Sequence, residues 1–168
     1  LYSSAQTGKT TELKQLCWEL QQSGLYLPVS FEVRTNTKLK RDDLPESQYV
    51  DGREVVLVID ALDEVNGQKY EDLLEEIGGY AYEHPEMKMV LSCRSNFRRE
   101  RQLELFTELF LEELSIDDAR DYAAKREVNS DRFMRSVFAN QLEDFIKNPF
   151  FLSVLIDAYK GKGKQLPK

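Results

Sequence analysis

The sequence has few residues of the kinds that form metal centres and disulfide frameworks. Its 168 residues include two cysteines and one histidine. Cys17 and Cys93 lie far apart, each in an apolar or strand-like stretch, so we expect two reduced core cysteines rather than a disulfide or a metal pair. His84 lies in a proline-containing turn, and we give it no catalytic part. This cysteine usage fits a reducing compartment, and we expect a cytoplasmic location.

Long apolar runs and an excess of basic side chains are also missing. No stretch approaches the roughly 18 apolar residues of a membrane helix, so we expect no membrane partner. The 30 acidic and 23 basic side chains leave a net charge of -7, which argues against a general nucleic-acid surface. The sequence does not begin with methionine, and we expect it to be part of a longer polypeptide.

The apolar pattern alternates between strands and helices up to about residue 114. Residues 55–59 are consecutive Val, Leu and Ile, which is typical of a parallel strand buried on both faces. Strands that alternate with amphipathic helices predict a parallel α/β sheet with right-handed crossovers. We therefore predict an α/β core over 1–114. Its expected elements are helices over 9–22 and 70–81 and strands over 27–33, 55–59 and 87–93.

From Ser115 onward the apolar periodicity is helical only. Ser115 and Asp118 resemble a capping box that opens the first helix. A second helix is expected over 133–146, and a third begins at Pro149, which takes the first helical position. We predict a small helical subdomain over 115–168.

The stretch SSAQTGKT, from Ser3 to Thr10, is the first candidate for chemistry. A phosphate-binding loop needs converging backbone N–H groups, a helix N-terminus, a lysine for the outer phosphates and a hydroxyl for magnesium. Gly8, Lys9 and Thr10 match the end of the motif G-x-x-x-x-G-K-[ST], but Ser3 stands where its first glycine would be. A polar helix-capping loop is the alternative interpretation. The candidate nucleotide-binding residues here are Ser3, Ser4, Ala5, Gln6, Thr7, Gly8, Lys9, Thr10 and Thr11.

A second candidate follows the buried strand over 55–59. Asp60 stands at the carboxyl end of that strand, where ligands bind in open α/β folds. A carboxylate there can hold Mg²⁺ while Thr10 contacts the ion from the other side. Asp63 and Glu64 are close enough in sequence to position or deprotonate an attacking water. The alternative is an acidic, solvated loop between a strand and a helix.

Four segments, taken in order, resemble NACHT-type NTPases of the STAND class of P-loop NTPases. IDALDE resembles that family's Walker B segment, and LSCRSNF resembles its next strand, which ends in a Ser/Thr-x-Arg sensor. FLEELSIDDARDYAAK resembles the last core strand and the first helix of the family's small helical domain. NPFFLSVLI resembles the segment whose proline touches adenine. The resemblance implies that Arg94 senses the terminal phosphate and that Pro149 contacts the base.

The resemblance also implies a fold and a function. It implies a three-layer α/β/α P-loop NTPase core that binds ATP or ADP with Mg²⁺. Nucleotide exchange or slow hydrolysis would switch self-association or effector activation, with effector and sensor domains on the same longer polypeptide. Antiviral defence and innate immunity are the settings typical of the family. Two alternatives stay open: a remodelling ATPase of the AAA+ kind, and a degenerate P-loop scaffold that binds partners without nucleotide.

Overall fold

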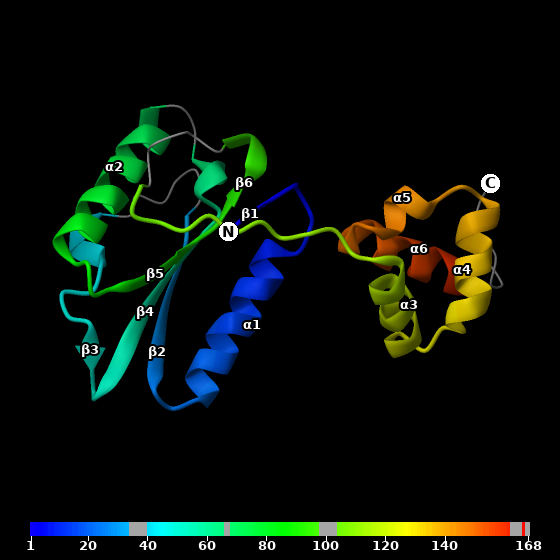
Figure 1. Cartoon of the computed structure of the whole chain (residues 1–168), viewed down its shortest axis with the longest axis horizontal. Coiled ribbons are helices and arrows are strands. Elements are labelled where there is room, and N and C mark those ends of the chain that lie inside the picture. The colour runs from blue at the N-terminus through cyan, green and yellow to red at the C-terminus, as the bar shows by residue number, and fades with distance from the viewer. Residues whose placement is uncertain (34–39, 66–67, 98–103, 162–165, 167–168) are drawn as a thin grey trace. The chain divides into compact units, whose positions relative to one another are not determined.

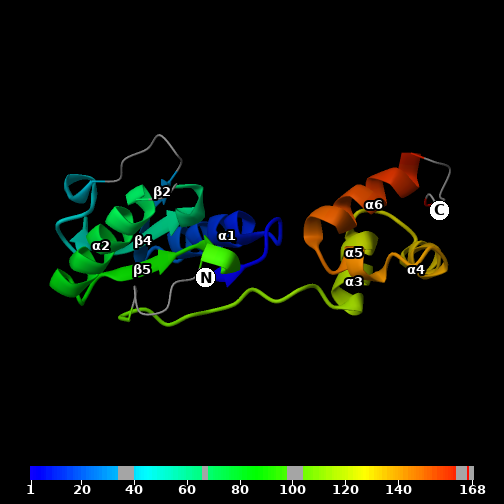
Figure 2. The same cartoon turned by 90° about the horizontal axis from the view of Figure 1, so that it is seen from above.

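The computed structural model contains two compact units, and Figures 1 and 2 show the elements of each. One unit comprises Leu1–Ala5 and Lys9–Leu111, and the other comprises Gln6–Gly8 and Glu112–Lys168. The boundary that we predict after residue 114 stays a prediction. The residues that the structure describes are 1–33, 40–65, 68–97, 104–161 and 166.

The central strand of the α/β unit is β4 (Arg53–Asp60). It pairs in parallel with β2 (Tyr26–Glu32) on one side and with β5 (Lys88–Leu91) on the other. In this register Leu57 lies opposite Met89. The side chains of β4 from its third residue onward are all buried, as expected for a strand covered on both faces. The predicted parallel sheet is therefore confirmed.

A short antiparallel hairpin and a proline mark the edges of this sheet. Strand β3 (Tyr49–Val50) pairs with the start of β4 through a two-residue turn. Asp51 and Gly52 both have positive φ in this turn, at 50° and 75°, as type I′ hairpins require. Pro28 lies within β2, which among the described strands pairs with β4 alone, and an edge strand tolerates the missing N–H.

Strand β6 (Cys93–Arg94) lies beside the first strand of the chain. It follows β5 after one intervening residue and pairs in parallel with β1 (Tyr2–Ser3). On the other side of β1, Tyr2 forms a parallel bridge with Phe110. The β5–β6 segment therefore separates β1 from β4. The carboxyl ends of β1, β4 and β6 point the same way, so the residues that follow them meet at one edge.

Helices cover both faces of the sheet. Leu13 of α1 (Lys9–Gln22) packs with Val56 and Val58 on one face. The buried side chains of α2 (Gln68–Glu83) pack with the other side chains of β4, including Leu57, on the opposite face. Alternate residues of a strand point to opposite faces, which divides β4 between these two clusters. This arrangement is the predicted three-layer α/β/α architecture (Figure 1).

The second unit is helical and begins with a capping box. Helix α3 (Ile116–Lys125) starts after Ser115, whose Oγ accepts a hydrogen bond from the Asp118 main-chain N–H at 3.1 Å, while an Asp118 carboxylate oxygen accepts from the Ser115 N–H at 2.9 Å. The predicted capping box is confirmed. Helix α6 (Pro149–Gly161) starts with proline, and the Asn148 side chain accepts from the Phe150 N–H at 3.0 Å.

The single helix predicted over 133–146 is wrong. The structure divides it into α4 (Ser130–Ala139) and α5 (Glu143–Ile146). Between them Gln141 has a φ of 56°, and two bonds of a Schellman motif form: Gln141 N–H donates to Phe138 O and Leu142 N–H donates to Val137 O. A glutamine in the left-handed position, where glycine is usual, left no stop signal in the sequence.

The helical unit has its own buried core. Side chains from all of its helices meet in this core, so the unit buries apolar surface by itself. Among the described residues, no helix has the length and apolarity to cross a membrane. The buried residues include Ala119, Ala123, Phe133, Val137, Ile146, Leu152 and Ile156.

Candidate functional site

The loop that joins β1 to α1 has two residues in left-handed conformations. Gln6 has a φ of 62° and Gly8 a φ of 98°. A Cβ atom built at Gly8 meets nothing within 4 Å, so the need for glycine there is conformational rather than steric. The loop leads directly into the first turn of α1, whose leading N–H groups have no partner within the helix. This strand–loop–helix sequence is the local structure that a phosphate-binding loop requires.

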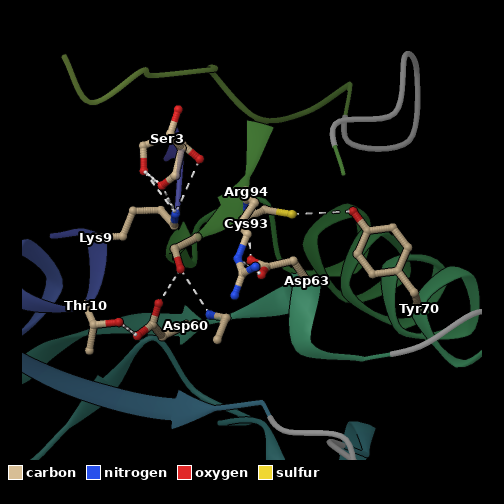
Figure 3. A network of polar contacts seen from close by, with 11 residues as sticks. Ser3, Lys9, Thr10, Asp60, Asp63, Tyr70, Cys93 and Arg94 are labelled. Atoms are coloured by element: carbon tan, nitrogen blue, oxygen red, sulfur yellow. Dashed lines mark hydrogen bonds and ion pairs between the residues drawn. The ribbon is translucent and has the colours of Figure 1, made fainter. Parts of the chain in front are cut away.

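Lys9, the first residue of α1, folds back onto the end of β1. Its Nζ donates to Ser3 Oγ at 2.9 Å and to the Ser4 carbonyl at 3.2 Å (Figure 3). Ser3 is buried, so its contact with Lys9 is partly shielded from solvent, whereas the contact with Ser4 is exposed. Burial lowers the pKa of Lys9, and the nearby Asp63 carboxylate opposes that shift. The serine that breaks the strict motif therefore holds the lysine in place.

Thr10 and Asp60 are in contact although 50 positions separate them along the chain. Thr10 Oγ1 donates to one carboxylate oxygen of Asp60 at 2.7 Å. Asp60 is buried at the carboxyl end of β4, at the edge where β1 also ends. A hydroxyl and a carboxylate side by side are the oxygen ligands that Mg²⁺ takes in nucleotide sites, together with waters and phosphates.

Ser92 is a site residue to which we assigned no role from the sequence. It lies between β5 and β6 and is fully buried. Its hydroxyl donates to the second carboxylate oxygen of Asp60 and accepts from the Ala61 N–H at 3.0 Å. Ala61 is in the left-handed conformation that turns the chain away from β4. The signal was its place in LSCRSNF, where Ser92 is the serine of the Ser/Thr-x-Arg pattern that ends in Arg94.

Asp63 and Arg94 form an ion pair beside this cluster. Asp63 lies in the 3₁₀ turn η2 (Leu62–Glu64), with its side chain 4% exposed. Arg94 contacts it twice: the main-chain N–H donates to one carboxylate oxygen at 2.9 Å, and Nε lies 2.8 Å from the other. Glu64, the next residue, is exposed. The structure therefore brings Lys9, Asp63 and Arg94 into one electrostatic neighbourhood.

The remaining predicted site residues belong to the loop, to α1 or to the helical unit. Ser4, Ala5 and Thr11 are exposed, the first two in the loop and Thr11 in the first turn of α1. Pro149 is the first residue of α6 in the helical unit. Its contact with adenine stays a prediction.

The residues at this sheet edge fit a magnesium nucleotide by their chemistry. A lysine ammonium and the start of a helix suit phosphate oxygens, and the Thr10–Asp60 pair suits the ion. No group of three or more His, Cys, Asp or Glu side chains placed to hold a metal occurs within the described ranges. A bound ion would therefore take most of its ligands from phosphate and water, as Mg²⁺ commonly does.

Comparisons with known proteins identify no family for this chain. No family model matches this sequence, and no curated protein matches it. Among solved structures, the Thermotoga maritima RuvB Holliday junction branch migration motor is similar, with a TM-score of 0.48 and 14% sequence identity. The match covers 99% of this chain and 63% of that chain, so this chain spans less than two thirds of the motor's length. We draw no functional conclusion from so distant a likeness.

Proposed function

We propose that this protein is a P-loop NTPase of the NACHT type that binds ATP or ADP with Mg²⁺. The observation that carries the proposal is the meeting of two distant motifs at one edge of the sheet. Lys9 follows the loop after β1, Asp60 ends β4, and the Thr10–Asp60 hydrogen bond joins the two segments. In a parallel α/β sheet this edge is where ligands bind.

Each residue has a role that follows from its chemistry. Lys9 would neutralise the outer phosphates, and the first N–H groups of α1 would bind them, because a helix N-terminus favours anions. Thr10 and Asp60 would hold Mg²⁺, which neutralises phosphate charge when bound. Arg94 would contact the terminal phosphate, and Glu64 would orient or deprotonate water. Ser3 supports binding, since its hydroxyl already fixes the lysine.

The proposal includes a switch rather than a motor. We propose slow ATP hydrolysis whose nucleotide state controls self-association or the activation of an effector domain on the same longer polypeptide. The support is the order of the motifs: the loop, the acidic segment IDALDE, the arginine after β6, and the helical unit with Pro149 at the start of α6. Defence signalling in the cytoplasm is the setting that we propose on the same resemblance.

A nucleotide-dependent stability measurement tests this proposal. We expect Mg-ATP at about 100 times its dissociation constant to stabilise the protein by about 2.7 kcal/mol. Lys9→Ala is expected to abolish that stabilisation, because it removes the charge that faces the phosphates. Lys14→Ala is the matched control, since Lys14 is exposed on the same helix. The measurement is a thermal melt with and without nucleotide.

Two results would contradict the proposal. One is a wild-type protein that gains no stability from ATP or ADP with Mg²⁺, which would favour the scaffold without nucleotide. The other is undiminished stabilisation of the Lys9→Ala variant, which would move the phosphate site away from this loop.

A further inference from the structure

Asp63 uses both of its carboxylate oxygens on a single residue. The Arg94 main-chain N–H donates to one oxygen at 2.9 Å, and Arg94 Nε lies 2.8 Å from the other. The Asp63 carboxylate contacts both the main chain and the side chain of Arg94. It therefore fixes the end of β6 and the direction in which the guanidinium group extends from it. Such charge-assisted bonds are about twice as strong as neutral ones.

A main-chain hydrogen bond also joins the segments that carry Asp63 and Arg94. Leu62 N–H donates to the Ser92 carbonyl at 3.1 Å, which ties the turn that carries Asp63 to the chain just before Arg94. The pair is therefore a built feature of the sheet edge rather than a surface ion pair.

The Arg94 guanidinium lies near the predicted phosphate site. Its positive charge lowers the pKa of Lys9, after the larger effects of burial and of Asp63. In Figure 3 the guanidinium extends from Asp63 toward the side of the cluster that holds Lys9 and Asp60. The Arg94 side chain is 46% exposed, against 4% for that of Asp63. The arginine can thus meet a ligand, while the carboxylate beneath it cannot easily meet water.

We propose that Asp63 is a positioning residue for Arg94 and does not act on water. This inference rests on the proposed function, and it leaves the role at water to Glu64, which is exposed. An arginine that is already fixed loses little conformational freedom when it binds a phosphate. Because ATP has a terminal phosphate that ADP lacks, the Asp63–Arg94 pair sets the preference for ATP over ADP.

The test is a double-mutant cycle read by nucleotide affinity. The dissociation constants of Mg-ATP and ADP are measured by titration calorimetry for the wild type, Asp63→Asn, Arg94→Lys and the double variant. We expect each single variant to reduce the ATP-over-ADP preference by about tenfold or more, the size of one hydrogen bond to a charged group. The double variant should lose no more of the ATP-over-ADP preference than Arg94→Lys alone, because the two residues act as one unit. Asp42→Asn, at an exposed aspartate of the same unit, is the matched control.

A second readout does not depend on nucleotide. In the wild type, the NMR resonance of the Arg94 Nε–H group should be shifted from the position of a solvent-exposed arginine, and its proton should be protected from exchange with water. In Asp63→Asn this resonance should be lost or should move. If Asp63→Asn fails to fold, Asp63→Glu, which keeps the charge but moves the carboxylate relative to Arg94, is titrated in its place and should also reduce the preference for ATP over ADP. The proposal is overturned if Asp63→Asn keeps the wild-type preference and only hydrolyses ATP more slowly, because that is the behaviour of a base. A wild type that binds no nucleotide would instead overturn the proposed function, and this inference with it.

Discussion

The buried hydroxyl of Ser92 offers a direct measure of how the sheet edge is held together. Ser92→Ala removes one donor to Asp60 and one acceptor from Ala61, and it leaves the shape of the core almost unchanged. The serine is fully buried and Asp60 is 9% exposed, so water cannot easily replace either bond. The change therefore isolates hydrogen bonding from packing.

The expected cost follows from the two lost bonds. A hydrogen bond to a charged group contributes about 1.5–3 kcal/mol, and a buried donor left without a partner costs about 1–3 kcal/mol. The effects overlap because both bonds share one hydroxyl, and Asp60 keeps its bond from Thr10. We expect Ser92→Ala to lower the free energy of unfolding of the α/β unit by about 2–4 kcal/mol.

Urea unfolding followed by Trp18 fluorescence measures this cost, since the chain's one tryptophan lies on α1 of the α/β unit. Ser23→Ala is the matched control. The Ser23 hydroxyl also donates one bond, to the Leu20 carbonyl, and accepts one, from the Leu25 N–H, but both lie in solvent. We expect Ser23→Ala to lower the free energy of unfolding by less than about 1 kcal/mol, because water replaces the hydrogen bonds of the serine hydroxyl. Equal losses for the two variants, or a loss below about 0.5 kcal/mol for Ser92→Ala, would refute the reasoning.

Two further predictions concern the acidic turn and the helical unit. Glu64→Gln should bind Mg-ATP as the wild type does but hydrolyse it more slowly, because Thr10 and Asp60 remain; an unchanged rate in single-turnover hydrolysis would remove Glu64 from the site. Ser115→Ala should destabilise the helical unit by about 0.5–2 kcal/mol, because it removes the cap of α3. Thermal unfolding followed by circular dichroism measures this loss, and Ser130→Ala, in the first turn of α4, is its control. Similar melts for these two variants would show that the cap contributes no stability.

Local patterns in the sequence were enough to predict most of the elements. The bounds of α1 at residues 9 and 22, the buried strand β4 and the capping box of α3 all follow from contacts within a few residues. The position of Asp60 at the carboxyl end of β4 follows from the apolar run before it. These features depend on side-chain periodicity and on caps, which short stretches of chain carry by themselves.

The break between α4 and α5 could not be predicted in this way. The apolar periodicity continues through it, and the left-handed residue is Gln141 rather than glycine. Phe138 in α4 and Phe145 in α5 are 41% and 47% exposed, so neither lies in the buried core of the unit. Packing of the unit, rather than local preference, decides where α4 ends.

The sequence by itself determined most of the elements of this protein and the order of its motifs, because both depend on neighbours in the chain. Only the tertiary structure decided the partners at the sheet edge: Ser92 with Asp60, and Asp63 with Arg94. The physical reason is that β5 and β6 enter the sheet between β4 and β1, which brings the carboxyl ends of distant strands together. Side chains that meet across strands in this way leave no periodic signal along the chain.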